Sequence, residues 1–235
     1  MPQHGFLRVN TWSVDESSAY DNSDSAGITY SVALKDVKAA RGGSDWDEQT
    51  TALDCACKLH VKIDATKLVT TLEIQNTGDK SFPFQALQHT YLKVDGQAAT
   101  DGAQCYVKGL EGYSVVDKVS KTEYPNGSDP ITITGEVDRV YNPPSPGDII
   151  GVEVIVGVGQ GKQVKSTAHG FVDGKQVPVS AVVWNPYIEK AASMSDFHND
   201  GYKEMICVEP LLHSESPADL EGGKTAKLIQ TLEML

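Results

Sequence analysis

The stretch CACKLHVKI at residues 55–63 decides the fold class, because its side chains alternate in polarity from one position to the next. Every odd position is apolar, and the even positions hold an alanine, two lysines and a histidine. Successive side chains of a strand point to opposite faces, so this period of two predicts a strand with one buried face. Cys55 and Cys57 fall on the apolar face, where cysteine behaves as a small hydrophobic residue. We expect both in the core, since a structural zinc site needs four ligands and no second pair follows.

The same pattern recurs along the chain, between turns marked by glycine, proline, asparagine and aspartate. Helical spacing is scarce, and one short helix is predicted at residues 188–197. The glycine-rich stretches at residues 157–162 and 222–225 lack the strand-to-helix context of a phosphate loop, so both are predicted as hairpin turns. The acidic segment at residues 15–24 is predicted as a solvated loop. Further strands are predicted at residues 28–34, 68–74, 84–92, 131–134, 152–158, 179–184, 205–210 and 227–232.

These elements predict an all-β fold, a β-sandwich with long loops. The chain has 235 residues, of which 40% are hydrophobic and 22% charged, enough to bury a sizeable core. No change of composition marks a boundary, so we expect residues 1–235 to form a single domain.

Charge and targeting signals exclude several classes of function. The chain carries 32 acidic and 20 basic residues, a net charge of −12. Nucleic acids and anionic membranes would repel such a chain, so neither is an expected partner. No apolar run approaches the ~18 residues of a membrane span, and no secretory signal is visible. Four cysteines do not make a disulfide scaffold, and we expect a reduced, cytoplasmic protein.

Three segments combine titratable side chains with strand-like sequence. QHGFLR at residues 3–8 brings an imidazole and a guanidinium close together, FQALQHTYL at residues 84–92 contains His89, and MICVEP at residues 205–210 contains Glu209. We expect His89 to be buried in its strand. Alone, each has a structural explanation, either a hydrogen-bonded core histidine or a carboxylate at a strand end. Together, a desolvated acid and base are more typical of an active site.

These segments resemble the hexose-6-phosphate mutarotases, or glucose-6-phosphate 1-epimerases, a branch of the aldose 1-epimerase superfamily. The likeness rests on residues 2–8, 87–92 and 183–210, where WNPYIEK is followed by MSDF and then CVEP. It implies a galactose mutarotase-like β-sandwich, of the supersandwich type, with the sugar site in an open groove on one sheet. It also implies an isomerase that interconverts the anomers of hexose 6-phosphates. This chemistry needs no metal or other cofactor, and we expect a monomer.

The resemblance further implies roles for individual residues. His89 matches the general acid of the family and Glu209 its general base. The residues that would hold the sugar are Gln3, His4, Arg8 and Asp138, of which Arg8 would meet the phosphate and Asp138 the hydroxyls.

Elementary chemistry agrees with these residue types. Exchanging anomers means opening a hemiacetal ring and closing it on the other face, which needs a base at the C1 hydroxyl and an acid at the ring oxygen. Glutamate, with a reference pKa of about 4.3, is expected to be ionised at neutral pH, which suits the base. Histidine, near about 6.5, suits the acid. The planar guanidinium of Arg8 matches phosphate oxygens bidentately, despite the net negative charge.

The sequence departs from the resembled family in two places. Family members carry a further segment before the stretch that matches residues 2–8, with early strands and an Arg-Gly-Gly-Ile-Pro segment at the phosphate site. Arg41-Gly42-Gly43 lies on the wrong side of residues 3–5 to replace it, and Leu211 stands where the family has glycine. We therefore expect missing N-terminal strands and an unpaired sheet edge, either in an incomplete gene product or in a naturally shortened relative. The alternative function is a non-catalytic relative that binds carbohydrate or sugar phosphate.

Overall fold

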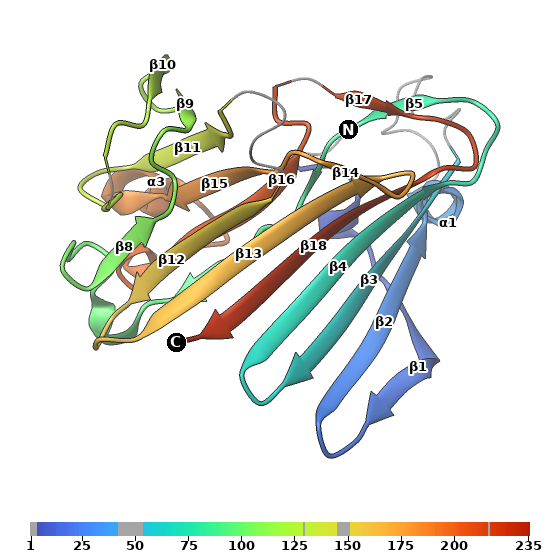
Figure 1. Ribbon diagram of the computed structural model, residues 1–235, viewed down its shortest axis with the longest axis horizontal. Helices are drawn as coiled ribbons and strands as arrows, with labels where there is room; N and C mark the ends of the chain where they lie inside the picture. Colours follow the sequence, from blue (N-terminus) through green and yellow to red (C-terminus); the bar gives the residue numbers. More distant parts are fainter. Residues whose placement is uncertain (1–3, 42–53, 129, 145–150, 216) are drawn as a thin grey trace.

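The computed structural model describes residues 4–41, 54–128, 130–144, 151–215 and 217–235. Antiparallel strands dominate, and most of them form two sheets (Figure 1). In spatial order, the larger sheet contains β1 (Ser13–Asp21), β2 (Ser25–Ala33), β3 (Cys55–Asp64), β4 (Lys67–Asn76), β18 (Thr225–Met234), β13 (Gln163–Val172), β12 (Val152–Val158) and β8 (Cys105–Lys108), with β14 (Lys175–Val177) paired to β13.

The second sheet carries Asp138 and Glu209, two of the candidate site residues. In spatial order it contains β10 (Thr122–Pro125), β9 (Ser114–Asp117), β11 (Val137–Asn142), β15 (Ser180–Asn185) and β16 (Met205–Leu212), with β6 (Ala86–Leu87) and β7 (Tyr91–Lys93) both paired to β16. The remaining described elements are the strand pair β5 (Phe82–Phe84) and β17 (Ala218–Leu220), the helices α1 (Leu34–Arg41) and α3 (Tyr187–Ser193), and the 3-10 turns η1 (Leu7–Val9), η2 (Asp95–Gln97) and η3 (Gly201–Lys203).

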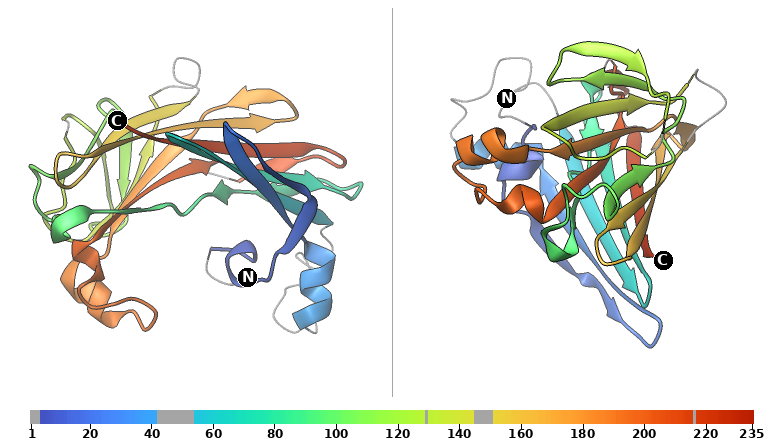
Figure 2. Two further views of the ribbon diagram at one scale, coloured as in Figure 1. Left: turned by 90° about the horizontal axis from the view of Figure 1, so that it is seen from below. Right: turned by 90° about the vertical axis from the view of Figure 1, so that its left-hand side faces the viewer.

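The two sheets share one hydrophobic core, and strand β16 shows how the chain divides its side chains between two faces. Ile206 and Val208 belong to the core, whereas Cys207 and Glu209 point to the opposite face. Each fully buried aliphatic side chain contributes about 1.5–3 kcal/mol to folding. Figure 2 (left) shows the sheets curved into an arch, with η1, α1 and α3 on its concave side.

The all-β prediction is confirmed, and so are most predicted strands. The stretch at residues 55–63 lies within β3, with Cys55 7% and Cys57 2% exposed. Residues 159–162 form the turn between the paired strands β12 and β13, as predicted. The turn at residues 222–224 joins β17 to β18, which lie in different sheets, so it is not a hairpin. The predicted helix at residues 188–197 is present as α3, but it ends at Ser193 instead of residue 197.

Three predicted elements were wrong. Residues 15–24 are mostly strand, because β1 pairs its backbone with β2, and backbone pairing leaves no mark on side-chain polarity. Residues 131–134 form only an isolated bridge from Ile131 to Val107, although Ile131 and Ile133 are buried. Residues 84–92 do not form one strand. They are divided among β5, β6 and β7, and His89 lies between β6 and β7.

Two other structural expectations concern the sheet edge and the membrane. The edge of β1 that faces away from β2 has no strand partner in the described part of the chain, as expected for an unpaired edge. None of the helices in the described ranges is long and apolar enough to cross a membrane.

Candidate active site

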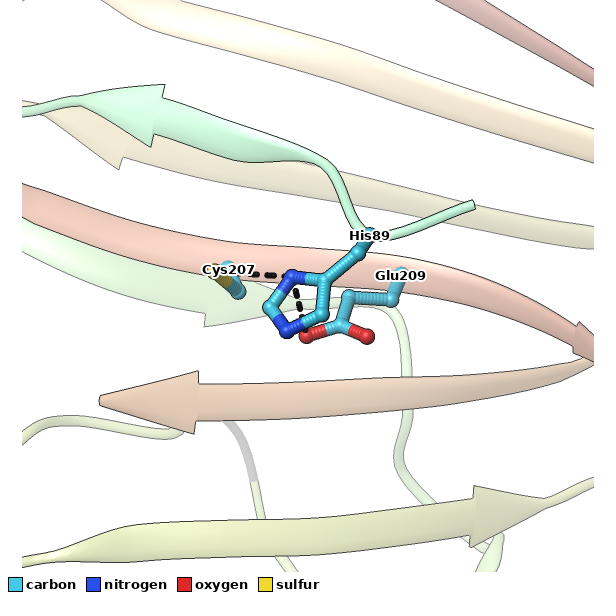
Figure 3. A group of neighbouring side chains, drawn as sticks. All are labelled: His89, Cys207 and Glu209. Atoms are coloured by element: carbon cyan, nitrogen blue, oxygen red, sulfur yellow. Dashed lines mark hydrogen bonds and ion pairs between the residues drawn. The ribbon is translucent and has the colours of Figure 1, made fainter. Parts of the chain in front are cut away.

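Strand register brings His89 and Glu209 together. Cys207 pairs with Tyr91 and Leu211 pairs with Leu87, and this common register places position 89 directly opposite Glu209. The His89 Nδ1 atom lies 3.2 Å from Glu209 Oε1 (Figure 3). The prediction of a buried histidine is wrong, because the His89 side chain keeps 30% of its surface exposed, whereas that of Glu209 keeps 3%. One partner of the pair is thus accessible and the other is enclosed.

The loop that carries His89 is fastened to the larger sheet by its two neighbours. The Gln88 side-chain amide donates to the Leu228 carbonyl at 2.7 Å, and the Thr90 hydroxyl donates to Gln230 Oε1 at 2.5 Å. Gln230 is 1% exposed, so this contact lies in the interior. Because extended backbone alternates its side chains, anchoring both neighbours inward turns His89 outward, toward Glu209.

Aromatic rings surround the exposed side of the pair. The Tyr91 ring stacks on His89 with centroids 4.9 Å apart, and Trp184 meets His89 edge-on at 5.8 Å. Phe197 extends the group beyond Trp184 at 6.2 Å. Across the sheet, Tyr91, Cys207, Trp184 and Asp138 occupy one continuous row of paired positions on β7, β16, β15 and β11.

A buried amide fixes the end of β15 next to this row. The Asn185 side-chain amide is 0% exposed and donates to the Tyr202 and Met205 carbonyls at 2.8 and 2.9 Å, and its oxygen accepts from the Tyr187 N–H at 2.9 Å. These bonds tie β15 to the start of β16. They hold Trp184, the preceding residue, against the row.

The N-terminal stretch reaches the same site. The His4 ring lies 5.6 Å from that of His89, and both His4 (φ 62°) and Gly5 (φ 74°) adopt the left-handed conformation that makes the turn. Arg8 Nη2 lies 3.4 Å from Asp196 Oδ2, with side chains 49% and 67% exposed. Gln3 lies outside the described residues.

Burial controls the charge of Glu209. It raises the pKa of this carboxyl to about 8, with a further increase from the negative charge of Asp138 and an opposing decrease from a hydrogen bond of Cys207. The pKa of His89 is lowered by burial, and then by the positive charges of His4 and Arg8. The expectation of an ionised glutamate was therefore wrong, because the reference value ignores desolvation. Both shifts favour a proton on Glu209 over a proton on His89.

Asp138 is a second carboxyl that the protein partly desolvates. Burial raises its pKa, as does Asp117, while Lys118, His4 and Lys190 lower it. Asp138 faces the same site as Glu209, since their charges influence one another. The structure thus brings His4, Arg8, His89, Asp138 and Glu209 to one region of the molecule.

One group of side chains in the described ranges has the donor atoms of a metal site. His89, Cys207 and Glu209 each offer a ligand atom, and these atoms lie within 4.8 Å of one another. Three protein ligands are fewer than a structural zinc site uses, although a catalytic zinc site can work with three. The absence of a metal stays a prediction, and proton transfer needs only the histidine and the carboxyl.

Sequence reasoning did not assign roles to several residues of this site, among them Cys207, Tyr91 and Trp184. The period of two contained a signal for two of them. Cys207 shares a strand face with Glu209, and Tyr91 would share one with His89. The sequence contained no such signal for Gln230, because this residue lies on the larger sheet and acts on the site through its hydrogen bond with Thr90.

Comparison with known proteins places this chain in one family. The sequence profile described as aldose 1-epimerase matches residues 1–232. A Cenchrus ciliaris protein named "Putative glucose-6-phosphate 1-epimerase" is 30% identical over 95% of this chain, and an Escherichia coli K12 protein of the same name is 26% identical over 100%. The crystal structure of a "putative mutarotase (YeaD)" from Salmonella typhimurium superposes with a TM-score of 0.73 at 22% identity, covering 100% of this chain and 68% of that one.

The chain therefore has a galactose mutarotase-like β-sandwich fold. It belongs to the aldose 1-epimerase family. It spans 62% of the length of the Cenchrus relative and 68% of the Escherichia coli relative.

Proposed function

We propose that this protein interconverts the α and β anomers of hexose 6-phosphates, with glucose 6-phosphate as the leading candidate. The observation that carries the proposal is the contact between His89 Nδ1 and Glu209 Oε1 at 3.2 Å, with one partner exposed and the other enclosed. Family membership and the names of the two relatives support this choice of reaction and substrate.

The pair would work by moving a single proton between its two members. In the form that opens the ring, His89 is protonated and Glu209 is ionised. Glu209 takes the proton of the C1 hydroxyl while His89 gives its proton to the ring oxygen, and the C1–O5 bond breaks to leave an aldehyde. After rotation about the C1–C2 bond, both transfers reverse on the other face. The net charge of the pair never changes, so a desolvated site suits this cycle.

The other site residues would hold the sugar. Asp138, His4 and Gln3 are proposed to bind hydroxyl groups, and the aromatic rings of Tyr91 and Trp184 offer apolar surface for a sugar face. Arg8 is proposed to bind the phosphate. Its partner Asp196 would be displaced, at small cost, because an exposed ion pair contributes only about 0–1 kcal/mol.

Exchange between the two anomers of glucose 6-phosphate, followed by NMR, tests the reaction. Catalysed exchange above a buffer blank is expected for the protein, with a loss of at least about 100-fold in Glu209→Gln and in His89→Gln. A matched control is Glu153→Gln on β12, an exposed glutamate outside the site. The proposal fails if the protein binds the sugar phosphate but exchange never exceeds the blank, which would instead identify the non-catalytic relative.

The role of the phosphate is tested with Arg8→Ala. We expect KM for glucose 6-phosphate to rise about tenfold, as for the loss of one charge-assisted contact, while KM for unphosphorylated glucose is unchanged. Equal effects on both sugars would refute phosphate recognition by Arg8.

A monomeric state and a cytoplasmic location remain part of this proposal.

A further inference from the structure

Among the residues that the structure describes, Cys207 lies close to both catalytic candidates, and it has no role in the scheme above. It lies two residues before Glu209 on the same face of β16 and is 0% exposed. Its Sγ atom lies 3.7 Å from His89 Nδ1 (Figure 3). The same Sγ atom lies within 4.8 Å of a carboxylate oxygen of Glu209. Strand geometry fixes this placement, because Tyr91 and Trp184 flank Cys207 on the neighbouring strands.

The thiol is held in its neutral, hydrogen-donating form. Burial raises the pKa of Cys207, and the negative charge of Glu209 raises it further. A neutral thiol has one S–H donor, and that donor favours an ionised carboxylate as its acceptor. Accordingly, the hydrogen bond of Cys207 lowers the pKa of Glu209 and opposes the effects of burial and Asp138.

The other groups around Glu209 cannot replace this donor. Asp138 on β11 is acidic, and Tyr91 on β7 stacks on His89 rather than bonding to the carboxyl. His4 and Arg8 act from the N-terminal stretch through their charge on His89. His89 itself must release its proton during each cycle, whereas the Cys207 S–H stays in place throughout.

We propose that Cys207 is a positioning residue of the acid–base pair, whose S–H donates a hydrogen bond to the Glu209 carboxylate and holds that carboxylate against His89. This inference rests on the proposed function. The form that opens the sugar ring has Glu209 ionised and His89 protonated. A fixed donor beside the carboxylate stabilises this form relative to the one with the proton on Glu209.

The test compares Cys207→Ala and Cys207→Val, which lose the donor, with Cys207→Ser, which keeps one. The readout is the pH profile of anomer exchange. Without the donor, we expect the plateau rate to fall about three- to tenfold and the basic limb to move up by about 0.5–1 pH unit, because the proton then resides more firmly on Glu209. In Cys207→Ser the basic limb should lie at the same pH as in the unchanged protein, and the plateau rate should be within about twofold of the unchanged protein's rate.

Cys105→Ala serves as the control. Cys105 is also 0% exposed, and burial likewise raises its pKa, but it lies on β8 away from the pair. Cys207→Val removes the donor without leaving a cavity, so it separates a lost donor from a lost packing contact if the alanine variant folds poorly. An equal fall in rate for all three Cys207 variants with no shift of the limb would overturn the proposal, since this is the result of lost packing alone.

A second measurement separates this inference from the proposed function. The carboxyl of Glu209 is titrated by carbon-13 NMR without substrate, its signal being the one that disappears in Glu209→Gln. We expect the midpoint pH of the Glu209 titration to be higher in Cys207→Val than in the unchanged protein. In Cys207→Ser the midpoint should return toward the value of the unchanged protein. An unchanged midpoint in Cys207→Val refutes the hydrogen bond, whereas absence of catalysed exchange in the unchanged protein refutes the reaction.

Discussion

Glu209 is a carboxyl group at a position where burial works against its ionisation. Its side chain is 3% exposed, its neighbours on β16 are apolar, and Asp138 adds a second negative charge nearby. A group in this environment lowers the stability of the folded protein whenever it must be charged. Active sites often contain such groups, because activity and maximal stability require different environments.

The first prediction is that Glu209→Gln stabilises the protein while it removes the proposed activity. An unfolded chain loses the Glu209 proton near pH 4.3 (about the reference value), whereas the folded protein retains it up to about pH 8. Over that interval the folded state binds more protons than the unfolded state, so stability falls as pH rises. Glutamine has no proton to lose. The melting temperature of Glu209→Gln should therefore exceed that of the unchanged protein by a difference that grows from pH 5 to pH 8 and reaches at least about 3 °C.

Calorimetric melting of both proteins at pH 5, 6.5 and 8 measures this difference. A matched comparison is Glu153→Gln, in which an exposed glutamate is changed and no such pH-dependent advantage should develop. A constant difference between Glu209→Gln and the unchanged protein at all three pH values would contradict the raised pKa.

The second prediction concerns the pH dependence of anomer exchange. The working pair carries one proton, so activity should fall on both sides of a plateau. The basic limb should lie near the Glu209 pKa of about 8, where the last proton is lost. The acid limb should lie below 6.5, because burial, His4 and Arg8 lower the pKa of His89. A rate that rises steadily through pH 9 would contradict a shared proton.

For single residues, the sequence indicated the candidates for the site but not their protonation states. His89 and Glu209 were identified from their motifs, and the structure brings them to 3.2 Å. The pKa of Glu209 could not be predicted, because it depends on enclosure by strands that are distant in the chain. Asp138 on β11 and the N-terminal stretch contribute to it only after folding.

The element that determines the position of His89 is the loop between β6 and β7. Gln88 and Thr90 anchor this loop to β18 through the Leu228 carbonyl and the Gln230 side chain. Gln230 also donates to Ser166 Oγ at 3.1 Å, which extends the contact into β13. The larger sheet therefore serves as a rigid support for a side chain on the smaller one.

The third prediction is that Thr90→Val slows exchange by about tenfold with little change in KM, because His89 is then held less firmly. The substitution keeps the side-chain shape but leaves Gln230 Oε1 without its donor, which should cost about 1–2 kcal/mol of unfolding free energy. Thr71→Val on β4 is the control, since Thr71 faces the other side of its strand from the network. Equal rates for the two variants would show that the anchor is not needed.

Alternation of polarity predicted strands well where one face is buried, and failed elsewhere. It placed β3, β4, β12 and β15 correctly, because each carries an apolar face against the core. It missed β1, whose side chains are nearly all exposed, and it merged β5, β6 and β7 into one strand. The breaks at residues 85 and 88–90 depend on hydrogen bonds to other strands, which local sequence does not contain.

For the molecule as a whole, the outer edge of β1 is the feature that bears most on association. Unpaired edges invite pairing with another chain, and natural proteins protect them with charge and with irregular register. Strand β1 has both: Asp15, Glu16 and Asp21 are exposed, and its pairing with β2 shifts register between Asp15 and Tyr20. With a net charge of −12, two copies also repel one another.

The fourth prediction is that the protein is a monomer whose edge is kept free by these charges. Combining Asp15→Asn, Glu16→Gln and Asp21→Asn should produce concentration-dependent dimers, which sedimentation velocity at 0.15 M salt (a Debye length of about 8 Å) would detect. A control variant removes the same number of charges from exposed turns, at Asp79, Glu111 and Glu221. If net charge alone prevents association, both variants should dimerise equally. If the copies associate through the β1 edge, only the β1 variant should dimerise. Adding Val14→Pro to that variant should then restore the monomer, because proline cannot donate a hydrogen bond to a neighbouring strand.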